Sequence, residues 1–106
     1  MKHTLRTFLL VVLVLTLVTG VASAAYVYES RYGHNTLKRG HRGTYVQNLQ
    51  IDLNDCYFDC GEADGIFGSK TEKAVKSYQA QRGLSVDGQA GYNTKTKLWY
   101  EKGQYQ

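Results

Sequence analysis

The chain has 106 residues, a formal net charge of +4 and no proline, and this length allows one small domain. A nucleic-acid-binding domain would be expected to carry a clustered basic face, and the small net charge argues against that class of function. The densest basic cluster, Lys38-Arg39-x-x-Arg42, is interpreted as solvated charge that precedes a helix.

The first 24 residues have the pattern of a secretory signal peptide. Lys2 and Arg6 give a positive start, residues 8–18 form an almost unbroken apolar run, and Ala22-Ser23-Ala24 is a small-residue cleavage site. Cleavage there would leave 82 residues with a net charge of +2. The alternative is an uncleaved membrane anchor, because residues 7–25 approach the roughly 20 residues that span a bilayer. We expect cleavage, and therefore a secreted protein with no membrane attachment.

Residues 25–35 show no periodicity and are expected to form a loose N-terminal arm, ahead of a folded domain over residues 36–102. The alternative is that the arm folds its tyrosines over the domain. Residues 36–42 are predicted to form a short helical turn, with Gly40 and Gly43 making the bend. Thr44 is the predicted N-cap of a first main helix over residues 45–55. Its core face has helical spacing, with Gln50 on the same side as the apolar residues Val46, Leu49 and Leu53.

Cys56 and Cys60 lie in the connecting loop, residues 56–62. In an exported chain, two cysteines four positions apart are expected to form a disulfide. The loop that it would close is short, so the bond would contribute only about 2 kcal/mol and pin one loop.

Two further helices follow, and together the elements predict an all-α fold, a compact three-helix bundle. The second helix is predicted over residues 69–81 and is ended by Gly83 in a left-handed conformation. Its inward stripe has the i, i+3, i+4, i+7 spacing of one helical face. A third, shorter helix is predicted over residues 92–101, with Leu98 and Trp99 inward. The inward residues of the second helix are Thr71, Ala74, Val75 and Tyr78.

One turn-into-helix unit occurs twice. Asp64-Gly65-x-x-Gly68-x-x-Thr71 reappears as Asp87-Gly88-x-x-Gly91-x-x-Thr94, with the same residue type at all matched places. This repetition predicts an internal duplication.

Three stretches carry a family resemblance: Leu37-x-x-Gly40-x-x-Gly43-x-x-Val46-x-x-Leu49-Gln50-x-x-Leu53, Asp64-Gly65-x-Phe67-Gly68-x-x-Thr71-x-x-Ala74-Val75-x-x-Tyr78-Gln79, and Gly83-Leu84-x-x-Asp87-Gly88-x-x-Gly91-x-x-Thr94-x-x-x-Leu98. Over residues 36–99 the chain resembles the small helical peptidoglycan-binding domain that is commonly attached to bacterial cell-wall hydrolases. Two features depart from that pattern: Ser69 and Tyr92 stand where the family often has proline, and the pair Cys56 and Cys60 is an addition.

The resemblance implies a non-catalytic, monomeric module that binds peptidoglycan, with no cofactor. It also implies a location in the extracellular space, the cell wall or the periplasm, and makes a cell-wall hydrolase a candidate partner. Two other functions stay open: a small secreted regulator of such a hydrolase, and a wall hydrolase itself. The clustered acids available to an enzyme are Asp59, Glu62 and Asp64, and solvation of the loop explains them without catalysis.

Motifs for catalysis and metal binding are absent where they would be expected. There is no Gly-x-Ser-x-Gly elbow, no His-Glu-x-x-His and no glycine-rich phosphate loop. A zinc site would have to combine His34 and His41 with the two cysteines, and export favours the disulfide instead. A calcium loop is excluded because its first and twelfth ligands would fall on Cys60 and Thr71.

The candidate ligand-binding site lies around the first Asp-Gly turn. An apolar pair beside two glycines could form the floor of a groove, and Lys70 beside the N-terminus of a helix could attract a ligand carboxylate. Two alternatives apply: the turn residues are purely architectural, or Asp64 itself occupies the helix N-terminus and leaves no room for a ligand. The predicted ligand-binding residues are Gln50, Asp64, Gly65, Ile66, Phe67, Lys70, Thr71 and Tyr78.

Overall fold

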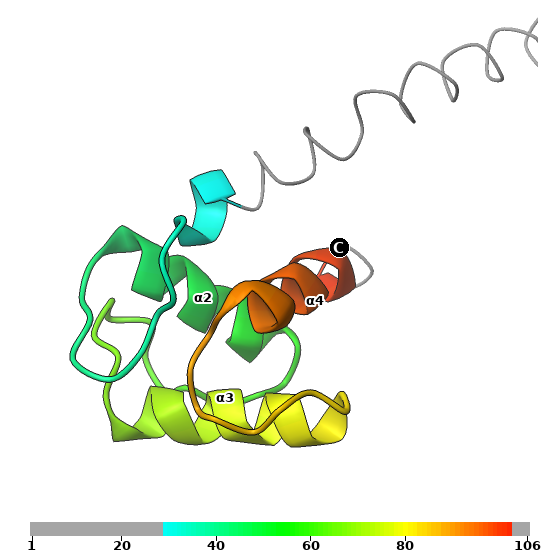
Figure 1. The fold of residues 1–106 in the computed structure, drawn as a ribbon. Coiled ribbons are helices and arrows are strands. Elements are labelled where there is room, and N and C mark those ends of the chain that lie inside the picture. Colours follow the sequence, from blue (N-terminus) through cyan, green and yellow to red (C-terminus); the bar gives the residue numbers. More distant parts are fainter. Residues whose placement is uncertain (1–28, 103–106) are drawn as a thin grey trace, which may run out of the picture.

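The computed structural model describes residues 29–102 and shows the predicted all-α bundle. The main helices are α2 (Thr44–Asp55), α3 (Ser69–Gln81) and α4 (Tyr92–Lys102), preceded by a helical turn over residues 29–32. Helix α2 contacts both other helices, with α3 running beneath it and α4 beside it in Figure 1. Within the described residues, β structure is limited to two isolated bridges, Leu37 with Ala90 and Arg42 with Ile66.

Helix boundaries follow the predictions closely, with two differences at the first helix. Helix α2 begins at Thr44 itself, and its N-cap is Gly43, which offers no side-chain hydrogen bond. Residues 36–42 are not a helical turn but extended backbone around a turn at residues 39–40. Their hydrogen-bonding groups pair with distant segments: the Leu37 N–H donates to the Ala90 carbonyl at 3.1 Å, and the Gly40 N–H to the Phe67 carbonyl at 3.0 Å.

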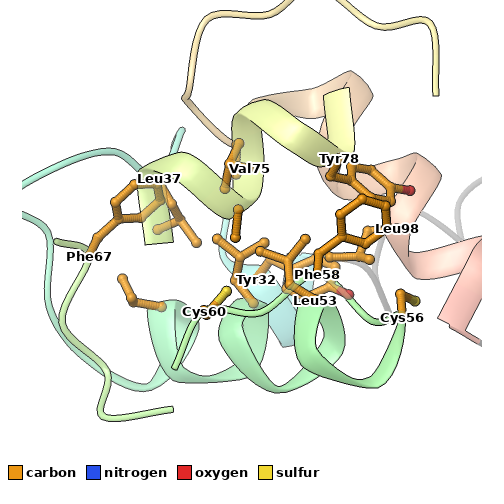
Figure 2. Close-up of a cluster of buried hydrophobic side chains, with 14 residues drawn as sticks. Tyr32, Leu37, Leu53, Cys56, Phe58, Cys60, Phe67, Val75, Tyr78 and Leu98 are labelled. Atoms are coloured by element: carbon orange, nitrogen blue, oxygen red, sulfur yellow. The ribbon is translucent and has the colours of Figure 1, made fainter. Parts of the chain in front are cut away.

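A single hydrophobic core lies between the three helices (Figure 2). Apolar positions at helical spacing face it, because burying one stripe of each helix is what stabilises a bundle this small. Phe58 and Tyr78 meet edge to face in this core, with ring centroids 5.1 Å apart. Its other buried members are Tyr32, Leu37, Val46, Leu49, Leu53, Cys56, Cys60, Phe67, Ala74, Val75, Ala90 and Leu98.

The described part of the N-terminal arm is packed on the domain and is not loose. The Tyr32 side chain is fully buried, and its hydroxyl donates to Asp52 Oδ2 at 2.5 Å. Arg31 donates to both oxygens of the same carboxylate, from Nε to Oδ2 at 2.7 Å and from Nη2 to Oδ1 at 2.6 Å. Since Asp52 is itself buried on α2, residues 31 and 32 supply the partners that its charge needs.

The remaining N-terminal predictions lie outside the described residues. These are the signal peptide over residues 1–24 and the first part of the arm, residues 25–28. Among residues 29–102, none of the helices combines the length and apolar character needed to cross a bilayer.

The predicted Cys56–Cys60 disulfide is not formed in this structure, in which both residues are buried free thiols. Cys56 follows the end of α2, and Tyr57 then turns the chain with a positive φ of 68°. Asn54 holds the returning loop by accepting from the Cys60 N–H at 2.7 Å and donating to the Gly61 carbonyl at 2.9 Å. The two sulfur atoms consequently lie at separate places along the core in Figure 2. Burial raises the pKa of the Cys56 thiol to about 11 and that of Cys60 to about 12.

Candidate functional site

The first Asp-Gly turn is built around the buried side-chain amide of Gln50. Its Oε1 accepts from the Gly65 N–H at 2.8 Å. Its Nε2 lies 2.9 Å from the Thr71 hydroxyl, 3.0 Å from the Ile66 carbonyl and 3.2 Å from Asp64 Oδ1. The amide therefore ties α2 to the turn and to the first turn of α3.

The second Asp-Gly turn has the same network around Gln79 of α3. The Gln79 Oε1 accepts from the Gly88 N–H at 3.0 Å. Its Nε2 donates to the Thr94 hydroxyl at 3.1 Å, to the Gln89 carbonyl at 2.9 Å and to Asp87 Oδ1 at 2.8 Å. The duplicated unit thus includes a glutamine that the sequence comparison of the turns did not reveal, because Gln50 and Gln79 stand at different distances from their turns.

The networks give the turn residues an architectural role. Gly65 and Gly88 have φ values of 79° and 74°, in the left-handed region that favours glycine. Each aspartate accepts from the N–H two positions later, Asp64 from Ile66 at 3.0 Å and Asp87 from Gln89 at 2.9 Å. Asp, Gly and Thr recur because each of them supplies one fixed hydrogen bond or backbone angle.

A hollow of about 280 Å³ opens beside the first turn, at the start of α3. Lys70 forms part of its wall, with its aliphatic stem lying across Gly61, where a Cβ atom would come within 3.0 Å of the Lys70 Cδ. Ile66 contributes an exposed apolar side chain. Of the predicted ligand-binding residues, the hollow brings together Gln50, Asp64, Ile66, Lys70 and Thr71.

The other predicted site residues lie elsewhere or beneath the surface. Phe67 is 1% exposed and Tyr78 fully buried, and both belong to the core, where Figure 2 shows them far apart. Gly65 is buried under the turn. Gln50 and Thr71 line the hollow but are 1% and 2% exposed, and the hydrogen bond from Gln50 to Thr71 holds the fold.

The start of α3 is not occupied by Asp64. The N-cap of this helix is Gly68, with no side-chain hydrogen bond to the helix. Asp64 instead turns back on its own loop, and its pKa is lowered by the hydrogen bonds from the Ile66 N–H and from Gln50. The positive end of the helix dipole therefore faces the hollow without a capping side chain.

Sequence reasoning missed several residues that line the hollow. Ser69 and Gly68 stand at the start of α3, and Glu62 and Gly61 belong to the preceding loop. Ser69 and Gly68 could have been found from their place within the motif. Glu62 and Gly61 could not, because the path of that loop is fixed by Asn54 from α2.

A second hollow, of about 180 Å³, stands at the start of α4. Seven of its lining residues correspond, in the turn unit and its glutamine, to residues that line the first hollow: Gln79, Asp87, Gln89, Gly91, Tyr92, Asn93 and Thr94. The chemistry differs, because Gln89 and Asn93 replace Ile66 and Lys70. The second copy therefore lacks the positive charge of Lys70, and its apolar lining comes from Leu84 and Tyr92 instead.

No group of three or more His, Cys, Asp or Glu side chains within residues 29–102 is arranged to hold a metal ion. The zinc ligand set considered from the sequence is thus not assembled in the described part of the chain.

Comparison with known proteins identifies the family to which this architecture belongs. Residues 42–98 match the family described as "Putative peptidoglycan binding domain". The chain belongs to this family. Its structure is similar to that of the SleB N-terminal domain, with a TM-score of 0.65 and 37% identity, covering 67% of this chain and 97% of that one. A peptidoglycan-binding protein from Clostridioides difficile, solved with glutamine hydroxamate, gives a TM-score of 0.63 at 36% identity, covering 65% of this chain and 43% of that one.

Curated relatives are longer proteins with enzyme names. The spore cortex-lytic enzyme of Bacillus cereus is 39% identical over 67 residues, which cover 63% of this chain and 26% of that protein. The N-acetylmuramoyl-L-alanine amidase CwlM of Mycobacterium tuberculosis is 41% identical over 58 residues, covering 55% of this chain and 14% of that one. The match thus spans about a quarter or less of these relatives.

Proposed function

We propose that this protein is a secreted, non-catalytic, monomeric module that binds peptidoglycan through the hollow at the start of α3. The observation that carries this proposal is the uncapped start of α3 opening into a hollow that also presents Ile66 and Lys70. Family membership supports the choice of polymer.

The lining of the hollow suits the chemistry of peptidoglycan. Its stem peptides carry carboxylates, which the Lys70 ammonium and the free N–H groups of the helix start can bind. Its sugars present apolar ring faces and acetamide groups, for which Ile66 provides an apolar contact. Asp64 and Glu62 can accept hydrogen bonds from sugar hydroxyls or peptide amides at the opposite wall.

Among the eight residues predicted from the sequence, we assign direct ligand contact to Asp64, Ile66 and Lys70, which are exposed. Gln50, Gly65 and Thr71 support the site from inside, because they are buried and joined there by hydrogen bonds. Phe67 and Tyr78 are buried in the core and are assigned no ligand contact.

Sedimentation with insoluble peptidoglycan tests the proposal. Wild-type protein is expected to pellet with purified sacculi, and Lys70→Gln to bind about tenfold more weakly, as expected for loss of one charge-assisted hydrogen bond. Lys73→Gln is the matched control, because Lys73 is also an exposed lysine of α3 but lies outside the hollow. Equal loss in both variants would point to non-specific charge attraction and contradict the proposed site.

A hydrolase partner is a separate proposal, supported by the enzyme names of the relatives. Capture of a hydrolase from envelope extract that has been cleared of peptidoglycan would support a regulatory role. Capture that occurs only when sacculi are present would indicate that the wall polymer, and not the enzyme, is the ligand.

A further inference from the structure

A third hollow, of about 400 Å³, lies between residues 32–37 and residues 40–45. We infer that it is a second subsite, which binds a carboxylate-bearing sugar unit through Arg42 and the ring of Tyr45. The choice of sugar rests on the proposed function, because the polymer named there supplies such units wherever the stem peptide has been removed from the lactyl group.

The floor of this hollow is fixed from inside the domain by Lys95. This α4 residue is fully buried, and its ammonium group donates to the Gly33 carbonyl at 3.1 Å and to the Asn35 carbonyl. The Gly33 N–H in turn donates to the Glu29 carbonyl at 2.7 Å. Residues 33–35 are therefore held at a set position by the buried Lys95 ammonium group.

Tyr45 forms a rigid platform on this floor. A Cβ atom at Gly33 would come within 2.7 Å of the Tyr45 Cδ2 and 2.9 Å of its Cε2, so only glycine lets the ring lie this close to the backbone. Tyr45 as a whole is still 49% exposed. An aromatic ring packed against the backbone and otherwise open suits the apolar face of a pyranose.

The rim of the hollow supplies donors and positive charge. Arg42 is exposed, and it makes no ion pair with any of the described residues, unlike Arg39, whose Nη1 lies 3.6 Å from Glu72 Oε1. His41 Nδ1 lies 3.4 Å from the Lys38 N–H, an arrangement that leaves Nε2 as the donor in the neutral ring. Among residues 29–102, no carboxylate side chain lines this hollow, although Glu29 reaches His34 at its edge, with 3.1 Å between Oε1 and Nδ1.

Two paired backbone segments each line one of the two hollows: residues 40–42 line the third hollow, and Asp64, Ile66 and Gly68 line the hollow at the start of α3. The Gly43 N–H donates to the Gly65 carbonyl at 2.9 Å, and the Phe67 N–H to the His41 carbonyl at 2.9 Å, with the bridge of Arg42 and Ile66 between them. A polymer that crosses this pair would meet Ile66 on one side and Arg42 on the other. Asp64 and Glu62 in the hollow at the start of α3 would then contact one group of the ligand. Arg42 in the third hollow would contact another group of the same ligand.

The test uses two sugars that differ in one group. N-acetylmuramic acid carries a lactyl carboxylate that N-acetylglucosamine lacks. Amide chemical shifts of the isotope-labelled full chain are followed during titration with each sugar. We expect N-acetylmuramic acid to shift Gly33, Asn35, Arg42 and Tyr45, and N-acetylglucosamine to bind there at least about fivefold more weakly, the loss expected for one charge-assisted contact.

Two variants make the assignment specific. Arg42→Gln should remove the preference for the acidic sugar, whereas Arg39→Gln, which changes a neighbouring arginine outside the hollow, should leave it intact. Equal affinity for the two sugars, or shifts confined to residues 61–71, would overturn the second subsite and leave the proposed function standing. Equally strong competition by inorganic phosphate would overturn the assignment of a sugar carboxylate. Failure of wild-type protein to sediment with sacculi would instead refute the proposed function.

Discussion

At the scale of single residues, two buried glutamines determine how the chain turns. Gln50 and Gln79 each join a helix to an Asp-Gly turn and to the helix that follows, using both ends of the side-chain amide. A buried amide is stabilising only when its partners are all in place, because each unpaired buried polar group costs about 1–3 kcal/mol.

Gln79→Leu is therefore expected to destabilise the domain by at least about 2 kcal/mol, because it leaves the Gly88 N–H and the Thr94 hydroxyl without their partner. Gln81→Leu makes the same chemical change at an exposed position of the same helix and should alter the free energy of unfolding by less than about 0.5 kcal/mol. Urea denaturation compares the two. Equal stability of the two variants would show that the amide network contributes nothing.

Phe67 is the second residue whose role the structure decides. The sequence makes it a candidate ligand contact and leaves a place in the core open as the alternative, and its ring lies in the core. Phe67→Ala is expected to cost about 3–5 kcal/mol of stability through lost burial and the remaining cavity. Ile66→Ala, at the adjacent exposed position, should melt near the wild-type temperature and weaken sedimentation with sacculi. An unchanged melting temperature for Phe67→Ala would show that the ring does not contribute to the core.

At the scale of elements, a polar cluster joins α4 to the end of α3. Arg82 Nε lies 2.8 Å from Glu101 Oε2, which also accepts from the Tyr78 hydroxyl at 2.8 Å. The same guanidinium stacks over Phe58 at 5.2 Å and Tyr78 at 5.4 Å from the ring centroids. These contacts lower the pKa of Glu101, first through the hydrogen bond from Arg82 and then through that from Tyr78.

The direction of this shift predicts the pH dependence of stability. Because the folded-state pKa of Glu101 lies below its ordinary value of 4.5, its contribution is complete above about pH 4.5 and is lost as the pH falls through the folded-state pKa. Glu101→Gln should lower stability at pH 7 by about 2 kcal/mol and by less at pH 3. Thermal unfolding of both proteins at the two pH values measures this. A loss of stability in Glu101→Gln that is as large at pH 3 as at pH 7 would exclude the carboxylate as its source. The control is Glu62→Gln, which makes the same change at an exposed position.

At the scale of the whole molecule, the domain extends further towards the N-terminus than residue 36. Tyr32 fills part of the core, Arg31 and Tyr32 hold the buried Asp52, and residues 33 and 35 accept from the buried Lys95. These contacts join the first described residues to α2 and α4, which are distant in sequence.

Removal of residues 1–35 is accordingly expected to destabilise the domain by at least about 3–5 kcal/mol relative to removal of residues 1–28, because Asp52 would be left buried without its partners. Urea denaturation of the two shortened proteins provides the comparison. Arg31→Gln isolates the ion pair within this effect. Equal stability of the two shortened proteins would show that residues 29–35 are an appendage after all.

The sequence by itself determined the helices, the bundle, the duplicated turn and the family, because these depend on local spacing: apolar residues at helical intervals, glycine at left-handed positions and aspartate beside free N–H groups. The limits of α3 could be predicted almost to the residue for that reason. Only the tertiary structure decided which of the predicted site residues reach the surface, since Phe67 and Ile66 are neighbours in sequence yet point to the core and to solvent. It also decided the pairing of Gln79 with the second turn, the burial of Tyr32 and Lys95, and the separation of Cys56 from Cys60. Each of these depends on contacts between segments far apart in the chain, whose geometry is set by packing and leaves no local pattern.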